Sequence, residues 1–331
     1  MATLCTVTTL DCPVEVLTTW VSYHLNIGVD HMFLFFDNPE HPGISSVAEN
    51  ARITPVRCDS EYWPGGSAKR ERLTLHERQW FNANKALQWA RERGFDWIAH
   101  IDSDELIYFD GNLKLGLDAI PNSVEVARLR VLEFIPRQLE YEHPFAGTHW
   151  FRVGPKRPAR KARPSSVHEW ILCLAEMASY YGRLGGAKLI CPGARGPFLR
   201  GHTGGKSLVR VTADIKGMGV HLPAPPDGRF FRNYFLPRAA ILHYDCGSFR
   251  YWMEKWMQRT SEKNVPRGRD AKRKRQAARF SATMKSEGLP GLYRLYFREY
   301  GLRDWEIRIL SGLRLVRRIH VSSRIPPTGL A

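Results

Sequence analysis

The sequence lacks the long apolar run, the paired cysteines and the internal repeats that identify several large classes of protein. No stretch resembles the roughly 20 consecutive apolar residues that a membrane-spanning helix requires. No two of its six cysteines are spaced as Cys-x-x-Cys, which argues against a structural zinc site. Because the N-terminus also lacks the basic segment of a signal peptide, we expect reduced cysteines and a cytoplasmic protein.

Negative charge is scarce in the last part of the chain. The 331 residues include 49 Lys+Arg and 33 Asp+Glu, a formal net charge of +16. Residues 251–331 hold 19 of these basic and 7 of these acidic residues, or +12, whereas residues 1–250 hold the remaining +4. Residues 1–250 are therefore nearly neutral, and residues 251–331 form a basic tail. Such a tail suits an anionic partner, which would be either a membrane surface or a nucleic acid.

Strand and helix patterns alternate along the first hundred residues. Residues 2–9, His31–Phe36 and Trp97–Ile101 are apolar or β-branched runs of the length of a buried strand, and apolar residues at helical spacing lie between them. This alternation predicts an α/β domain with a mostly parallel sheet flanked by helices over residues 1–245. A basic helical extension is expected over residues 246–331.

Three acidic residues follow the strand Trp97–Ile101 within the segment Ile-Asp-Ser-Asp-Glu. Ligands of open α/β sheets bind beyond the carboxyl ends of the strands, which is where Asp102 and Asp104 would lie. Two neighbouring carboxylates repel each other unless a positive charge lies between them. Mn²⁺ or Mg²⁺ would neutralise the pair and could bridge to diphosphate oxygens. The alternative is that these acids only cap the following turn.

Several segments carry a resemblance to a known family. They are Trp20–His31 followed by Phe35–Asn38, Trp97–Leu106, Gly205–Arg210 and His243–Tyr244. Together they resemble a bacterial glycosyltransferase family 2-like group that is related to glycosyltransferase family 92. The resemblance implies a GT-A fold (Rossmann-like) and a metal-bound nucleotide diphosphate. It also implies sugar transfer with inversion, from a UDP-linked or other nucleotide-sugar donor to a hydroxyl of a saccharide or lipid-linked acceptor.

The resemblance also implies roles for individual residues. Those expected to contact the nucleotide are Thr8, Thr9, Asp37, Gln79, Asn82, Asp102 and Lys206. Asp37 would lie near the base or the ribose. The alternative for Lys206 is an ordinary place on a surface strand. The metal is expected on Asp102, Asp104 and His243.

His243 is included because it ends a short apolar run, and the resembling family has a His-Tyr pair at this place. Imidazole is an acceptable ligand for Mn²⁺. His221 is the competing histidine, and both could instead be ordinary hydrogen-bonded residues of loops. An inverting transfer needs a general base, and Glu133 and Glu169 are the candidates. The alternative for each is an ordinary surface carboxylate. Asp104 and Glu133 are therefore the predicted catalytic residues.

The basic tail permits two further interpretations. The run Lys272–Arg275 suggests nucleic-acid binding, although the body is nearly neutral and contains no recognised nucleic-acid motif. A helix over residues 302–319 would have apolar residues on one face and arginines on the other, as in helices that lie on anionic bilayers. Such a helix would place the protein at the inner face of the membrane. The alternative is that its apolar face packs on the protein's own domain.

Overall fold

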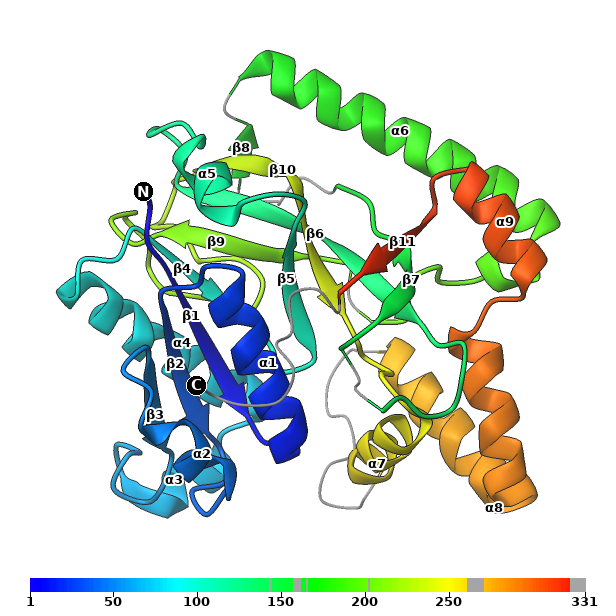
Figure 1. Cartoon of the computed structure of the whole chain (residues 1–331), viewed down its shortest axis with the longest axis horizontal. Helices are drawn as coiled ribbons and strands as arrows, with labels where there is room; N and C mark the ends of the chain where they lie inside the picture. The colour runs from blue at the N-terminus through cyan, green and yellow to red at the C-terminus, as the bar shows by residue number, and fades with distance from the viewer. Residues whose placement is uncertain (143–144, 157–161, 165, 202, 261–270, 322–331) are drawn as a thin grey trace.

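A mixed β-sheet runs through the chain, with helices on both of its faces (Figure 1). The computed structural model describes residues 1–142, 145–156, 162–164, 166–201, 203–260 and 271–321. The strands are β1 (Leu4–Leu10), β2 (His31–Phe36), β3 (Ile53–Arg57), β4 (Trp97–His100), β5 (Glu105–Phe109), β6 (Val126–Ile135), β7 (Thr148–Val153), β8 (Ala162–Pro164), β9 (Lys206–Arg210), β10 (Phe231–His243) and β11 (Val316–His320). The helices are α1 (Val14–Asn26), α2 (Gly43–Ala48), α3 (Gly66–Arg72), α4 (Leu75–Glu92), α5 (Leu113–Asp118), α6 (Val167–Ile190), α7 (Phe249–Thr260), α8 (Ala271–Tyr300, kinked at Gly288) and α9 (Asp304–Gly312), with a 3₁₀ turn at Pro192–Ala194.

Most strands of the sheet point in one direction. The strand order is β11-β7-β6-β9-β4-β1-β2-β3, and β10 pairs with β5, β6 and β8 beside this row. Among the described strands, β5, β7 and β9 run against the others. The predicted α/β class with a mostly parallel sheet flanked by helices is therefore confirmed.

The sheet is buried on both faces because successive side chains of a strand point to opposite sides. On β2, Leu34 and Phe36 pack with α1, whereas Phe33 and Phe35 pack with α4. Helix α4 begins at a capping box formed by Thr74 and Glu77, which fixes the first turn of the helix. The carboxyl ends of β1, β2 and β4 consequently lie next to the first half of α4.

The C-terminal residues return to the sheet instead of forming one long helix. The helix predicted over residues 302–319 is wrong, because α9 ends at Gly312 and Val316–His320 is a strand that pairs antiparallel with β7. Arg314 has a left-handed φ of 55°, which no helix continues through. Leu310, Val316 and Ile319 are buried, so these apolar residues pack within the protein and offer no face for a membrane. Residues 261–270 and 322–331 of the predicted extension lie outside the described part of the chain.

Helix α6 has no counterpart among the sequence-based predictions. Ser166 caps its N-terminus by accepting the backbone N–H of Glu169. Its second half contains Gly182, Gly185 and Gly186, which disfavour a helix and obscure its periodicity. Although α6 is long, no helix among the described residues is long and apolar enough to cross a membrane.

Candidate active site

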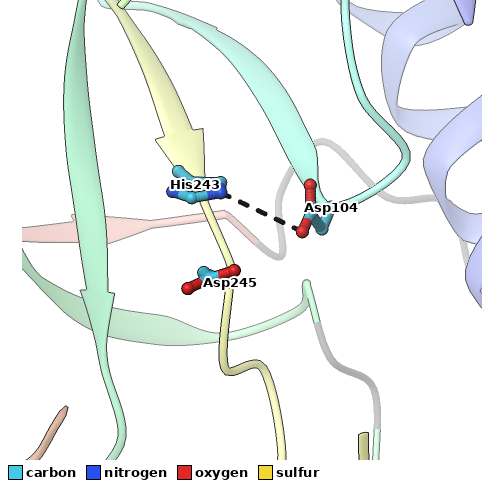
Figure 2. Close-up of side chains that lie close together, drawn as sticks. All are labelled: Asp104, His243 and Asp245. Atoms are coloured by element: carbon cyan, nitrogen blue, oxygen red, sulfur yellow. Dashed lines mark ion pairs between the residues drawn. The ribbon is translucent and has the colours of Figure 1, made fainter. Parts of the chain in front are cut away.

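Two strands bring three side chains of metal-binding type together. β5 begins directly after Asp104 and pairs antiparallel with β10, which places Glu105 opposite His243. The backbone N–H of Tyr244 donates to the carbonyl oxygen of Asp104 at 2.8 Å, so the residue that follows β10 stays close as well. The ligand atoms of Asp104, His243 and Asp245 all lie within 4.8 Å of one another (Figure 2). Two carboxylates and an imidazole form a donor set that fits Mn²⁺.

A lysine of α7 contacts both carboxylates of this group. Lys255 Nζ lies 2.9 Å from Asp104 Oδ2 and 2.6 Å from Asp245 Oδ1. Burial alone would raise the pKa of each carboxyl, but Lys255 opposes it strongly, and the pKa of both Asp104 and Asp245 lies below its ordinary value. Both groups are therefore negatively charged at neutral pH, and the space that they share already attracts a cation.

Asp102 belongs to a neighbouring group of charges. β9 runs antiparallel to β4, so the beginning of β9 meets the end of β4 and brings the buried Lys206 to Asp102. Lys206 Nζ donates to Asp102 Oδ2 at 2.7 Å and lies 3.1 Å from Glu105 Oε2. Burial raises the pKa of Asp102 while Lys206 lowers it. The structure thus joins Asp104 to His243 but not to Asp102, whose role as a metal ligand stays a prediction.

The residues expected to contact the nucleotide lie along one edge of the sheet. Thr8 and Thr9 lie next to the carboxyl end of the buried strand β1, and Asn82 Nδ2 of α4 donates to Thr9 Oγ1 at 2.9 Å. One helical turn earlier, Gln79 Nε2 donates to Asp102 Oδ1 at 3.1 Å. These bonds bring most of the expected nucleotide contacts together at the ends of β1 and β4.

Asp37 lies at the end of β2 and is held by two arginines. Arg78 of α4 donates from Nε and Nη2 to its two carboxylate oxygens at 2.7 and 2.8 Å. Arg70 lies 3.8 Å from the same carboxylate and donates to the backbone oxygen of Asp37 at 2.7 Å. The carboxylate is therefore fixed in position, and its contact with a base or ribose stays a prediction.

Asn82 connects three elements through a buried amide. Besides its bond to Thr9, its Oδ1 accepts the hydroxyl of Tyr62 at 2.6 Å. Asn82→Ala is expected to lower the free energy of unfolding by about 2 kcal/mol, because it leaves the buried hydroxyl of Thr9 and the partly buried hydroxyl of Tyr62 without this partner. Urea denaturation measures the change. Gln88→Ala, at an exposed position of the same helix, serves as the control and should change stability far less; an equal loss would contradict the assigned role.

Glu133, one of the two candidates for the general base, lies next to His243 because β6 and β10 pair in parallel with these residues opposite each other. Its two oxygens accept the backbone N–H groups of Arg200 and Gly201, the first at 2.7 Å. Its side chain therefore orders the loop that passes over β10. Glu169, the other candidate, lies in the first turn of α6.

His221 lies outside the group formed by Asp104, His243 and Asp245. Its ring Nδ1 is 3.2 Å from the carbonyl oxygen of Gly205, and its own carbonyl accepts the hydroxyl of Ser207 at 2.7 Å. These contacts place His221 on the side of β9. The geometry therefore favours His243 over His221 as the histidine beside Asp104.

Two residues of the site do not appear among the sequence-based expectations. Asp245 follows His243 with one residue between them, the same spacing as Asp102 and Asp104, and it too follows the end of a strand. That repeated pattern could have indicated it. Lys255 comes from the next helix, and no local pattern distinguishes it from the other basic residues of the tail.

A cavity of about 350 Å³ opens beside Asp104. Tyr141, Phe145, Tyr244 and Tyr251 contribute aromatic rings to its wall. The carboxylates on the same wall are Glu15, Asp104 and Glu254. An aromatic surface next to charged and polar groups is typical of sites for small polar ligands.

The similarities of the chain to known proteins agree on one class. No protein-family model matches it. A glycosyltransferase-like protein of Arabidopsis thaliana is 23% identical over 273 residues, which are 74% of this chain and 54% of the relative. A second such protein of the same plant is 23% identical over 169 residues, covering 45% of this chain and 33% of its own. A glycosyltransferase family 92 protein of Ricinus communis is 32% identical over 133 residues, covering 39% of this chain and 22% of its own.

The chain spans about half the length of the first of these relatives. Among solved structures, HddC from Yersinia pseudotuberculosis is 14% identical with a TM-score of 0.26, over 46% of this chain and 67% of its own. The names of the three relatives support a glycosyltransferase family for this protein.

Proposed function

We propose that this protein is a metal-dependent glycosyltransferase that moves a sugar from a nucleotide-sugar donor, most simply a UDP-sugar, to a hydroxyl acceptor. The observation that carries the proposal is the group Asp104, His243 and Asp245, which lies beside a cavity where β5 and β10 meet. The names of the similar proteins support the reaction class.

The two groups of charges have separate roles in this proposal. Asp104, His243 and Asp245 would hold Mn²⁺ or Mg²⁺, which supplies positive charge to the leaving diphosphate when it is bound. Lys206 fixes the carboxylate of Asp102 through its 2.7 Å bond, on the side of the sheet where β1 and α4 would bind the nucleotide.

The acceptor would bind in the cavity beside Asp104. The apolar faces of sugar rings pack well against aromatic side chains, and Tyr141 and Tyr251 offer such surfaces. An inverting transfer needs a base to take the proton of the acceptor hydroxyl. Because backbone N–H groups occupy both oxygens of Glu133, we place this base on the wall of the cavity, at Glu15 or Glu254.

The test is the release of a nucleoside diphosphate. The purified protein would be incubated with UDP-glucose, UDP-galactose and UDP-N-acetylglucosamine, in Mn²⁺, in Mg²⁺ and in a chelator, with saccharide and lipid extracts as acceptors. We expect UDP to form from at least one donor, faster with an acceptor and only with the metal. Absence of UDP release from every donor in every extract would contradict the proposal.

His243 and His221 are expected to differ in their effect on the metal. His243→Ala should weaken Mn²⁺ binding at least tenfold, about 1.4 kcal/mol, because it removes a ligand atom next to Asp104. His221→Ala should change the affinity much less. Isothermal calorimetry with Mn²⁺ measures both. The opposite ranking would move the site to His221, and equal small effects would leave the metal on carboxylates alone.

A further inference from the structure

Helix α6 packs on the rest of the protein along one face and leaves the opposite face exposed. Tyr180, Leu184 and Ala187 are the buried residues of the inner face. Figure 1 shows α6 at the periphery, with α9 close to its C-terminal end. The outer face consists of Val167, Trp170, Ile171, Leu174, Ala178, Tyr181, Gly182, Gly185 and Leu189, all of which are exposed. Its one charged neighbour on α6 is Lys188, which lies five helical turns after Trp170 at the edge of the face.

The outer face is large for a surface that stays in water. The exposed fractions are 48% for Trp170, 55% for Ile171 and 78% for Leu189. With typical side-chain areas, its six large apolar residues expose on the order of 600 Å², the upper limit for a patch on a monomer. Contact between the outer faces of two copies would bury about 1,200 Å² in total, which is the lower end of the area that stable protein interfaces bury.

Three glycines near the outer face have no explanation within one copy of the chain. A Cβ added to Gly182, Gly185 or Gly186 would meet no described atom within 4 Å. Each glycine inside a helix costs about 1 kcal/mol relative to alanine. Glycine is useful where another chain must approach the backbone closely. This cost therefore points to a partner that packs against the second half of α6.

The outer face is complementary to itself when the helix is reversed. Its first half carries Val167, Trp170, Ile171 and Leu174, and its second half carries Gly182 and Gly185 together with Tyr181 and Leu189. Ile171 and Leu174 lie as far before Ala178 as Gly185 and Gly182 lie after it. In an antiparallel pair of α6 helices with Ala178 on the twofold axis, Ile171 and Leu174 each meet a glycine of the other copy. The opposed positions are Ile171 with Gly185, Leu174 with Gly182, and Val167 with Leu189, the last being a contact between two apolar side chains.

We propose that two copies of this protein form a symmetric dimer through the outer faces of α6. A twofold interface requires a surface that fits its own copy, and the pairing about Ala178 provides one. A bilayer explains the same face less well. Helices that lie on membranes carry lysine and arginine around a bulky apolar face, whereas the middle of the second half of this face consists of Gly182 and Gly185, which would insert little into lipid.

The first test is the mass of the full chain in solution, measured by analytical ultracentrifugation. We expect a dimer for the natural sequence. Gly182→Leu and Gly185→Leu should weaken association at least 100-fold, because leucine fills the space that the opposite helix needs. Both changes should preserve folding, since leucine favours a helix over glycine. Ser179→Leu, at an exposed position off the outer face, is the matched control and should leave the dimer intact.

The second test is a disulfide across the twofold axis. In a Cys173→Ser background, Ala178→Cys should cross-link two copies under mild oxidation, because identical positions on the axis come within the reach of a disulfide. Ser179→Cys should not cross-link. A monomeric natural chain, a dimer that tolerates both leucines, or equal cross-linking of the two cysteines would overturn the proposal. Flotation of a monomeric chain with phosphatidylglycerol vesicles, lost in Trp170→Ser, would assign the face to lipid instead.

Discussion

Asp104→Asn is expected to reduce Mn²⁺-dependent binding of UDP at least 100-fold, about 2.7 kcal/mol. Asp104 is the member of the metal group that lies nearest the cavity, and its carboxylate already attracts Lys255 at 2.9 Å. An amide of the same shape removes the negative charge on which a hard divalent ion depends. Isothermal calorimetry of UDP in Mn²⁺ measures the loss, and circular dichroism checks that the fold persists.

Asp110→Asn is the matched control for this experiment. Asp110 follows the opposite end of β5, and half of its side chain is exposed. Its replacement should leave UDP affinity unchanged. If Asp104→Asn bound UDP in Mn²⁺ as tightly as the natural protein, the metal would have to lie elsewhere, and Asp102 would be the next residue to examine.

Lys255→Met is expected to have opposite effects on stability and on metal affinity. Without metal, the free energy of unfolding should fall by about 4 kcal/mol, because two largely buried carboxylates lose the cation between them. Mn²⁺ should bind at least tenfold more tightly, since Lys255 no longer competes for the same oxygens. The thermal stabilisation by Mn²⁺ should therefore be larger in the variant than in the natural protein.

Lys285→Met, an exposed lysine of α8, provides the control for the loss of one positive charge. It should alter neither stability nor metal affinity appreciably. If Lys255→Met were destabilised and Mn²⁺ restored none of the loss, the carboxylates of Asp104 and Asp245 would form only an ion pair with the lysine. The proposed metal site would then be wrong, and the description of the fold would be unaffected.

A strand or helix is predictable from the sequence where its apolar residues follow a simple pattern on one face or on both faces. The buried strands β1, β2 and β4 are short apolar runs, and each lies close to where the sequence places it. The last helix was predicted too long because apolar residues at helical spacing continue past Gly312, where the chain turns and joins β7. Helical spacing describes one face of a segment, and it cannot reveal that the segment changes from helix to strand.

The site was predictable where its residues follow a strand. Asp102 and Asp104 could be found because an apolar run ends in acids, and His243 because another run ends in histidine. Their separation into two groups depends on Lys206 and Lys255, which come from other elements. Lys206 contacts Asp102 because β9 pairs with β4. Lys255 contacts Asp104 because α7 lies beside the end of β10.

The most direct test of the proposed function is a thermal-shift screen of nucleotide sugars with and without Mn²⁺. A ligand that binds the folded protein raises its melting temperature, and the rise grows with the logarithm of the ligand concentration divided by Kd. We expect at least one nucleotide sugar, most simply a UDP-sugar, to raise the melting temperature by several degrees in Mn²⁺ and to have no effect in a chelator. Melting temperatures that no nucleotide sugar changes, with or without the metal, would contradict the assignment of a metal-dependent glycosyltransferase.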